Sequence, residues 1–400
     1  MGDRPFSSYP SNFEITVKIA MPINQSTFRE RLVAARHLLA DAKLDGLLIF
    51  CPENRRYLSG FTAADCSLNE SSGCLLISQE AAFLLTDFRY REWALAEAPH
   101  FEVQIYQKGL PKLLTEIIAR LGLSCLGFET HYLTYCGYQK ITETAAAAGL
   151  QMQWQPVDNL IEQLRVIKDA EEISLIQQSL AITEKVIAAV GRNLRPGRSE
   201  KEVARMIETG LAEAGAEGPS FTPIVASGPN SARPHHHPGD RLIEANEPII
   251  IDMGAIYQGY CSDMTRTFFL GEPDAKFKEV YSLVRRAQRQ AEIGMRAGMM
   301  SDAADGLARQ VIAQAGYQEA FGHSLGHGVG LAVHENPNLS PHQERAVELK
   351  TGMVATVEPG VYLPEWGGVR LENMVLIQPD GVQVLNQNLD FYHFGNTSAT

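Results

Sequence analysis

The chain has 400 residues, more than one hydrophobic core usually organises, so two domains are expected. Its 45% hydrophobic and 20% charged residues, with a mean hydropathy of −0.13, exclude an intrinsically disordered chain. The net charge of −12 without a long basic cluster argues against nucleic acid as a partner. No apolar run approaches the ~20 residues that a membrane-spanning helix needs.

The first residues predict an N-terminal extension rather than an export signal. Residues 1–24 lack a basic start and an uninterrupted apolar core, so we expect no secretory signal and a cytoplasmic protein. The cysteines show no CxxC spacing and are expected to be ordinary thiols rather than a disulfide framework. They are Cys51, Cys66, Cys74, Cys125, Cys136 and Cys261.

Residues 25–160 alternate helix and strand signals, which predicts an α/β domain with a mixed sheet. Thr27 and Glu30 form a capping-box pattern that predicts a helix start. Short strands are expected over residues 46–50, 73–78 and 81–88.

Residues 161–400 predict a second domain of the α+β class. Helix starts are indicated at Asp169, with Glu172 three residues later, and at Ser199, with Glu202. Further helices are expected over about 275–296 and 302–315, and strands over about 353–358 and 368–377. Two helices followed by strands, twice in succession, predict a pseudo-symmetric αα-β repeat with the sheet enclosed by helices.

Two aspartates, Asp252 and Asp263, lie in a segment that predicts two strands joined at residues 257–260. With an even-numbered tight loop, side-chain alternation places both carboxylates on one face of the hairpin. Like charges so placed repel each other, and a divalent cation between them removes the conflict. The alternative is that both are solvated residues beside a turn. It fits poorly with the apolar run 248–251 before Asp252, where an unpaired charge is costly to bury.

A glycine-rich segment, GHSLGHGVGLAVHEN, carries His323, His327 and His334. Its glycines favour a loop or irregular strand over a helix, and it lacks the glutamate of an HExxH zinc motif. Isolated histidines are usually structural or exposed, but three so close together indicate a functional role.

Glu358 ends one predicted strand and Glu372 lies in the next, with the connection centred near Glu365. Simple antiparallel pairing places Glu358 and Glu372 on one face, whereas Glu365 is expected to be exposed. Either of the paired glutamates alone could be an outward polar residue beside a lysine; both together favour a metal site. The carboxylates and histidines thus indicate metal-assisted hydrolysis.

Three adjacent histidines, His235, His236 and His237, precede Pro238 in a loop rich in serine, glycine and proline. The residues alone leave open whether this is a functional or a fortuitous polar loop.

Five segments, in order between about residues 165 and 385, resemble the pita-bread metallopeptidases, the family of methionine aminopeptidase, aminopeptidase P, prolidase and creatinase. They are VASGPNSARPHH, IDMGAIYQGYCSDMTRTF, GHSLGHGVGLAVHE, VEPGVY and GGVRLEN. They are most similar to the Xaa-Pro peptidases, aminopeptidase P and prolidase. RRYLSGF (55–61) and LLTDFRYREWA (84–94) are weaker echoes of the family's amino-terminal domain. The resemblance implies a pita-bread catalytic domain over 161–400, preceded by a smaller creatinase-type α/β domain over 25–160.

Carried over residue by residue, the resemblance implies five metal ligands: Asp252, Asp263, His327, Glu358 and Glu372. It implies His235, His323 and His334 as substrate-binding or transition-state histidines, and Arg370 and Tyr362 as supporting residues. Asn373 departs from the family, which often has an aspartate at this position. The charge of the residues that surround the ligands therefore differs from that of the family, but no ligand is lost.

The implied activity is hydrolysis of the Xaa-Pro bond in dipeptides or at the N-terminus of short peptides, with a metal-bridging hydroxide as nucleophile. Glu358 is the expected proton acceptor, His334 with His323 the oxyanion stabilisers, and His235 a contact on the leaving-group side. An oxygen-rich ligand shell with one imidazole suits two Mn²⁺ ions, with Co²⁺ or Zn²⁺ as alternatives. The expected partners are a small peptide substrate and a second copy of the chain in a homodimer.

Two other functions stay open from the sequence. One is a creatinase-like hydrolase or lyase acting on a small non-peptide substrate, and the other is a non-catalytic peptide-binding module. The intact set of five ligands argues against a metal-free creatinase and against an eroded binding module.

Overall fold

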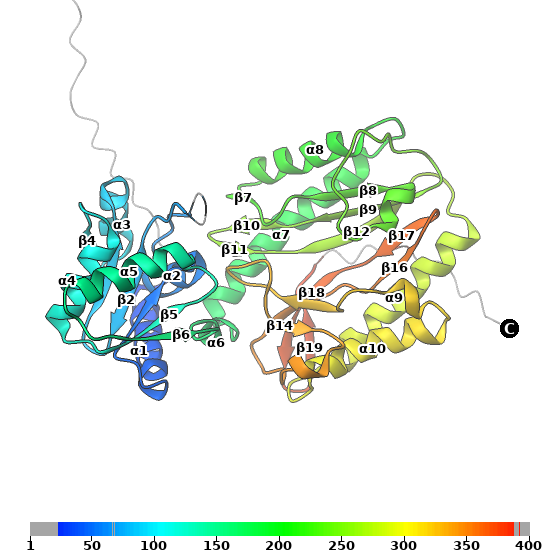
Figure 1. The fold of residues 1–400 in the computed structure, drawn as a ribbon. Coiled ribbons are helices and arrows are strands. Elements are labelled where there is room, and N and C mark those ends of the chain that lie inside the picture. Colours follow the sequence, from blue (N-terminus) through cyan, green and yellow to red (C-terminus); the bar gives the residue numbers. More distant parts are fainter. Residues whose placement is uncertain (1–22, 66, 68, 388–391, 393–400) are drawn as a thin grey trace, which may run out of the picture.

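The structure is a computed structural model that describes residues 23–65, 67, 69–387 and 392. Most of the expected N-terminal extension, as well as Cys66, lies outside these residues. Figure 1 shows two lobes. We call residues 23–157 the N-lobe, residues 158–169 the connector and residues 170–387 the C-lobe. The five described cysteines are all free thiols, as expected.

The N-lobe contains one six-stranded sheet in the order β4-β3-β2-β1-β5-β6. Its strands are β1 Gly46–Ile49, β2 Cys74–Ser78, β3 Ala82–Thr86, β4 Glu102–Ile105, β5 Cys125–Glu129 and β6 Gln153–Val157. β1 runs antiparallel to β2 and parallel to β5, which confirms the expected mixed sheet.

Helices cover both faces of this sheet, which explains why its central strands read as continuous apolar runs. They are α1 Gln25–Asp41, α2 Pro52–Ser59, η1 Phe88–Tyr90, α3 Arg91–Glu97, α4 Leu110–Leu121 and α5 Tyr135–Ala147. Leu47 and Ile49 pack in the same cluster as Leu39 of α1, whereas Leu48 packs with Ile118 of α4 and Ile141 of α5.

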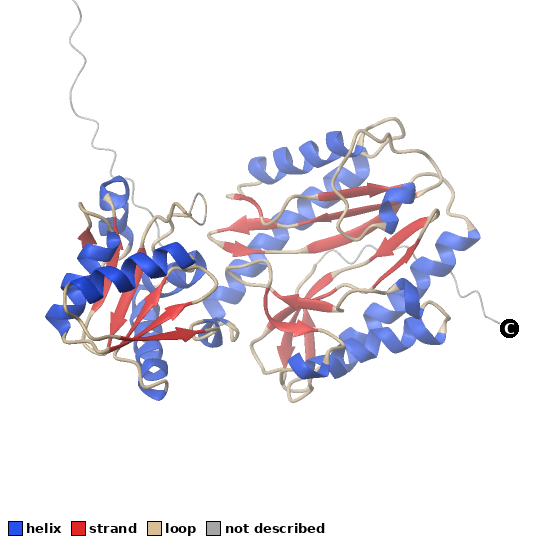
Figure 2. Ribbon diagram, viewed as in Figure 1, coloured by secondary structure: helices blue, strands red, loops and turns tan. Residues whose placement is uncertain are grey.

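The C-lobe repeats one order of elements twice, as expected. The first repeat has α7 Ala170–Asn193 and α8 Glu200–Glu213, then β7 Gly218–Pro219, β8 Ile224–Ser227, η2 Gly228–Ala232, β9 Pro248–Met253, β10 Ala255–Tyr257, β11 Tyr260–Cys261 and β12 Met264–Phe269. The second has α9 Ala275–Gly294 and α10 Ser301–Gln314, then η3 Gln318–Ala320, β13 Gly326–Gly328, β14 Glu335–Leu339, η4 Gln343–Arg345, β15 Val354–Val357, β16 Gly360–Leu363, β17 Gly367–Arg370, β18 Asn373–Gln378 and β19 Gly381–Val384. The strands lie between the two helix pairs (Figure 2), which is the pita-bread arrangement.

The strands of the C-lobe form several small sheets rather than one continuous sheet. β12-β9-β8 form one three-stranded sheet, β11-β10-β7 another, and β14-β13-β15-β18-β19 a five-stranded sheet. β16 and β17 pair with each other. Asp263, Glu358 and Glu372 lie where the chain passes from one of these sheets to another, and Asp252 lies near the end of β9.

Two of the three predicted helix starts are confirmed. Asp169 and Ser199 each form a complete capping box at the start of α7 and α8. The start predicted at Thr27 is wrong, because the side chain of Asn24 accepts from the Ser26 amide and starts α1 earlier. The strand expected over 368–377 is also divided, because β17 ends at Arg370 and β18 begins at Asn373.

By length and composition alone, α7 is apolar enough to cross a membrane, a segment that we did not expect from the sequence. Half of its most apolar 18-residue window is buried inside the protein. Ser179 and Thr183 of this helix hydrogen-bond the Ser262 hydroxyl, each at 2.9 Å. We therefore interpret α7 as a core helix of the C-lobe.

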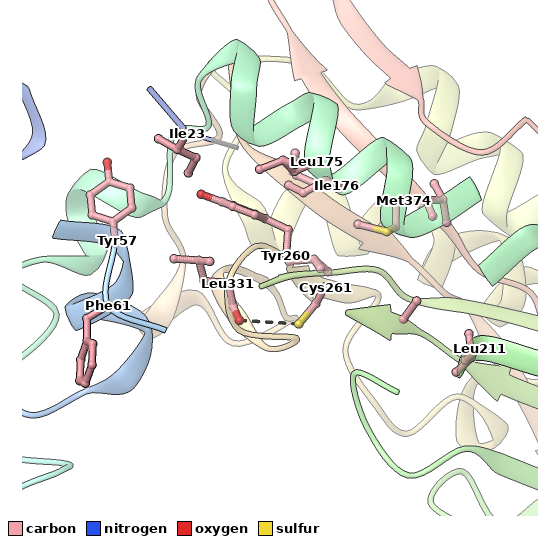
Figure 3. Packing of buried hydrophobic residues seen from close by; sticks show 14 of the residues in the cluster. Ile23, Tyr57, Phe61, Leu175, Ile176, Leu211, Tyr260, Cys261, Leu331 and Met374 are labelled. Atoms are coloured by element: carbon pink, nitrogen blue, oxygen red, sulfur yellow. Dashed lines mark hydrogen bonds between the residues drawn. The ribbon is translucent and has the colours of Figure 1, made fainter. Parts of the chain in front are cut away.

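The two lobes pack through a continuous apolar cluster (Figure 3). Ile23 and Tyr57 of the N-lobe face Tyr260 and Leu331 of the C-lobe. The buried Glu172 carboxylate accepts from the Tyr260 hydroxyl at 2.9 Å and lies 3.4 Å from the Arg31 guanidinium. The N-lobe is thus fixed beside the C-lobe by both apolar and charged contacts.

Candidate metal centre and active site

The aspartate hairpin turns tightly at Gln258 and Gly259, whose φ values of 49° and 81° suit a two-residue hairpin loop. Tyr257 pairs with Tyr260 across this loop, and Asp252 pairs with Thr265 in the same register. Asp263, two residues before Thr265, therefore shares a face with Asp252. The even-numbered loop expected from the sequence is confirmed.

The two glutamates occupy a similar hairpin in the second repeat. Val357 pairs with Asn373 and Gly360 pairs with Arg370, so Glu358 and Glu372 lie opposite each other between these pairs. Both occupy the gap where the chain leaves the five-stranded sheet for the β16–β17 pair. Glu365, at the tip of this hairpin, is exposed as expected.

His327 joins the carboxylates from β13, which is an irregular strand with a register shift directly after this residue. Its Nε2 atom lies 3.3 Å from Glu358 Oε1 and 3.6 Å from Asp263 Oδ2. Its Nδ1 atom lies 3.0 Å from the Gly328 carbonyl, which orients the ring. Asp263, His327 and Glu372 each place a ligand atom within 4.8 Å of the other two.

The donor set fits divalent cations. Asp252 Oδ1, Asp263 Oδ1 and Glu372 Oε1 are buried, and each lacks a hydrogen-bond partner among the residues that the structure describes. Buried carboxylate oxygens without a partner are costly, so a cation is the natural counterpart. The other oxygens are oriented by protein donors: Arg370 binds Asp252 at 2.6 Å and Thr265 binds Glu372 at 2.8 Å.

The electrostatics of the protein alone show how strongly this site needs positive charge. Burial, followed by the neighbouring carboxylates, raises the pKa of Asp263 and of Glu372 well above their usual values. Burial also raises the pKa of Glu358 to about 8, although Arg370 acts in the opposite direction. A bound divalent cation favours the charged forms and removes this conflict.

We expect metal-free protein to lose stability as the pH rises from 6.5 to 8. A carboxyl whose folded pKa is raised above its unfolded value contributes most when protonated, and that contribution falls by about 1.4 kcal/mol per pH unit and per carboxyl. His323 offsets only a small part of this change, because burial lowers its folded pKa to about 4 and its unfolded form, with an ordinary pKa of 6.5, has lost most of its proton within one pH unit above that value. Urea unfolding after chelation, with and without added Mn²⁺, measures the effect; equal pH slopes in the two series would contradict it.

A cavity of about 860 Å³ opens over these residues, in the size range of sites for small ligands. The sequence-predicted residues that line it are Asp252, Asp263, His327, Glu358, His235, His323, His334 and Arg370. The remaining two, Glu372 and Tyr362, are buried and contact this lining through hydrogen bonds and charge. The structure therefore brings all ten residues to one place.

Arg370 links the acidic cluster to the histidines. Its guanidinium donates to Asp252 and, at 2.9 Å, to the Tyr362 hydroxyl, whose oxygen lies 2.9 Å from His323 Nε2. The other ring nitrogen of His323 lies 2.8 Å from the Ser324 carbonyl and must donate to it. Because burial lowers the pKa of His323 to about 4, the ring is neutral near pH 7 and Nε2 accepts from Tyr362. His323 is thereby held neutral and fixed.

The first two of the three adjacent histidines, His235 and His236, differ in their contacts. His236 Nε2 lies 2.8 Å from the fully buried Glu200 carboxylate. Glu200 also accepts from the Ser227 and Gly239 amides and thereby shapes the loop that carries His235. All three histidines line the cavity, and His235 does so without such an anchor on the part of the chain that the structure describes.

Replacing His235 by alanine should reduce kcat/KM by roughly 10–100-fold, because the side chain faces the cavity. His236→Ala should leave kcat/KM within about threefold of wild type and lower the free energy of unfolding by about 1–3 kcal/mol, because it removes a partner from the buried Glu200. Peptide hydrolysis and urea unfolding of both variants, with His342→Ala, an exposed histidine outside the cavity lining, as control, measure this. Equal losses of activity for His235→Ala and His236→Ala would show that the wrong histidine is assigned.

Sequence reasoning missed two threonines that support the ligands. Thr265 binds Glu372, and the Thr356 hydroxyl donates to Glu358 at 3.1 Å and accepts from the His327 amide at 3.0 Å. Each lies two residues from a predicted ligand, Asp263 or Glu358, so strand alternation could have found both.

Asn373 stands where the family often has an aspartate. Its neutral side chain both accepts and donates a hydrogen bond. It is fully buried, accepts from Arg266 at 3.1 Å and donates to Glu292 at 2.6 Å. An ionised aspartate could not donate to Glu292.

A two-repeat pita-bread lobe with a carboxylate-rich centre is the arrangement that the sequence resemblance implied for a metallopeptidase. Residues 174–379 match Metallopeptidase family M24, and residues 31–167 match the Creatinase/Prolidase N-terminal domain. The chain belongs to metallopeptidase family M24 and is a peptidase. The resemblance seen in the sequence and the two-part fold expected from it are confirmed.

Several relatives span nearly the whole chain. An Xaa-Pro dipeptidase of Pyrococcus horikoshii is 37% identical over 345 residues, covering 86% of this chain and 93% of the relative. The solved Xaa-Pro dipeptidase from Bacillus anthracis matches with a TM-score of 0.84 and 37% identity, over 90% of this chain and 98% of that one. The X-Pro aminopeptidase from Thermotoga maritima matches with a TM-score of 0.80 and 34% identity, over 89% and 97%.

Proposed function

We propose that this chain hydrolyses the Xaa-Pro bond of dipeptides, or the first such bond of short peptides, with two divalent metal ions. The observation that carries the proposal is the trio of buried, unpartnered oxygens on Asp252, Asp263 and Glu372 beneath a ligand-sized cavity. His327 and Glu358 complete the proposed set of ligands. When bound, such a metal pair polarises the scissile carbonyl and lowers the pKa of the attacking water.

The protein side chains then have separate tasks. Glu358 accepts the proton from the attacking water and delivers it to the leaving nitrogen. His334 donates to the oxygen that becomes negative as the carbonyl carbon turns tetrahedral. His323 was expected from the sequence to stabilise the same oxygen, but its two ring nitrogens face the Ser324 carbonyl and the Tyr362 hydroxyl. We propose that it instead supports His334 by holding Tyr362 and Arg370 in place, and that His235 contacts the leaving-group side of the substrate.

The preference for proline is supported by the relatives named above. An Xaa-Pro bond has no N–H, so a site that cleaves it cannot depend on that donor. We further propose Mn²⁺ as the metal, with Co²⁺ or Zn²⁺ as substitutes, a homodimer as the assembly, the cytoplasm as the location, and a domain boundary at residues 160/161, within the connector.

A panel of peptides at a fixed Mn²⁺ concentration tests the function. We expect hydrolysis of Ala-Pro, of Ala-Pro-Ala, or of both, and none of Ala-Ala under the same conditions. The ratio of the first two rates decides between a dipeptidase and an aminopeptidase. Turnover of Ala-Ala with neither proline peptide cleaved would refute the proposed specificity.

A further inference from the structure

Glu335, the residue after His334, carries a carboxylate that is held by two cations of the connector. Its Oε2 accepts from Arg165 at 2.6 Å, and its Oε1 accepts from Lys168 at 2.6 Å. The three side chains are only 8%, 5% and 1% exposed, respectively. Removing one partner from such a buried ion pair leaves an uncompensated charge, which is strongly destabilising. The three side chains are therefore held in this arrangement.

This ion triad continues into the N-lobe. Arg165 also donates to the Asn54 amide oxygen at 2.9 Å, and Asn54 donates to Glu129 at 2.6 Å. Glu129, at the end of β5, accepts from the Phe50 and Cys51 amides at 2.6 and 2.7 Å. A chain of hydrogen bonds therefore runs from the carboxyl ends of β1 and β5, two interior strands of the N-lobe sheet, to the segment that carries His334.

The same carboxylate shapes the wall of the cavity. Glu335 pairs with Gly328, the neighbour of His327, and the His327 and His334 rings lie edge to face with centroids 4.4 Å apart. Gly330 folds directly over Glu335: a Cβ on this glycine would lie 2.4 Å from Oε1. The segment 328–335 is thus wrapped around an anchored carboxylate.

We propose that Glu335 is a positioning residue that, through Arg165 and Lys168, holds His334 at the metal centre and ties its position to the N-lobe. The inference rests on the proposed function for the role of His334. It adds that the connector and the N-lobe take part in setting up the transition-state contact.

Glu335→Gln tests this, because it keeps the shape and removes the charge. Glu335 lines the cavity, but both of its carboxylate oxygens are engaged by Arg165 and Lys168 rather than free to bind substrate. We therefore expect kcat for Ala-Pro to fall roughly 10–100-fold with KM within about threefold. In a double-mutant cycle, adding His334→Ala to Glu335→Gln should cost little more than His334→Ala alone. Unchanged kcat, or losses that multiply independently, would overturn the inference.

Hydrogen–deuterium exchange of residues 326–339 gives a second readout that needs no turnover. Exchange should rise in Glu335→Gln and, more mildly, in Arg165→Lys, which retains the charge if the first variant fails to fold. Glu172→Gln is the matched control, since it alters another buried carboxylate between the lobes, away from the residues lining the cavity. Equal exchange in all variants and wild type would overturn the inference. Failure of the wild type to cleave any Xaa-Pro peptide would refute the proposed function instead, and exchange would still decide on Glu335.

Discussion

Glu358→Gln should reduce kcat for Ala-Pro by roughly 10³-fold, the size expected for loss of a general base. The neutral amide cannot accept the proton from water and is also a poorer metal ligand. In the metal-free protein burial raises the pKa of Glu358 to about 8, so the bound cations are needed to keep this side chain a carboxylate that can accept a proton. Initial rates at saturating substrate and fixed Mn²⁺ measure the effect, together with the metal content of the purified variant.

Glu365→Gln is the matched control, because this glutamate is exposed at the tip of the same hairpin. It should retain wild-type kcat and stability. If Glu358→Gln keeps near-wild-type turnover with metal bound, Glu358 is neither the base nor an essential ligand.

Complete removal of metal should lower activity to below about 1% of its starting value, because the carboxylates and histidines of the cavity do not lower the pKa of water or polarise the carbonyl as a bound metal pair does. Dialysis against EDTA followed by addition of Mn²⁺ should abolish and then restore hydrolysis of Ala-Pro. Metal analysis of each sample by mass spectrometry relates the recovered rate to the number of ions bound.

Asp263→Asn and Asp240→Asn provide the paired variants for this experiment. Asp263 lies in the acidic cluster, whereas Asp240 is exposed and pairs with Lys201. The first should bind less metal at a given concentration and the second should match wild type. Undiminished turnover after verified loss of all metal would refute the mechanism.

Local sequence patterns predicted much of the geometry of the site. Strand alternation and loop length correctly predicted that Asp252 and Asp263 share a face, because register in a hairpin is set within a few residues. The same reasoning applied to Glu358 and Glu372, although the strand around Glu372 is interrupted. Side-chain hydrogen bonds also made the starts of α7 and α8 predictable.

Contacts between distant segments were not predictable in this way. His236 is distinguished from His235 only by Glu200, which lies 36 residues earlier in the chain. The pairing of Arg165 with Glu335 spans 170 residues. Such contacts depend on how the lobes pack, and no periodicity in one sequence records them. Only the residues flanking the ligands, such as Thr265 and Thr356, could have been found from the pattern itself.

The proposed ligands are divided between the two halves of the C-lobe: two aspartates come from the first repeat, and one histidine and two glutamates from the second. Neither half can assemble the centre by itself, so cation uptake and cohesion of the halves are thermodynamically linked. Each tenfold rise in free cation above its dissociation constant would add about 1.4 kcal/mol against unfolding for each ion bound. In a cell short of the metal, the protein would therefore be inactive and its two C-lobe halves would be less stably associated. The contact between the halves would then be more susceptible to proteolysis.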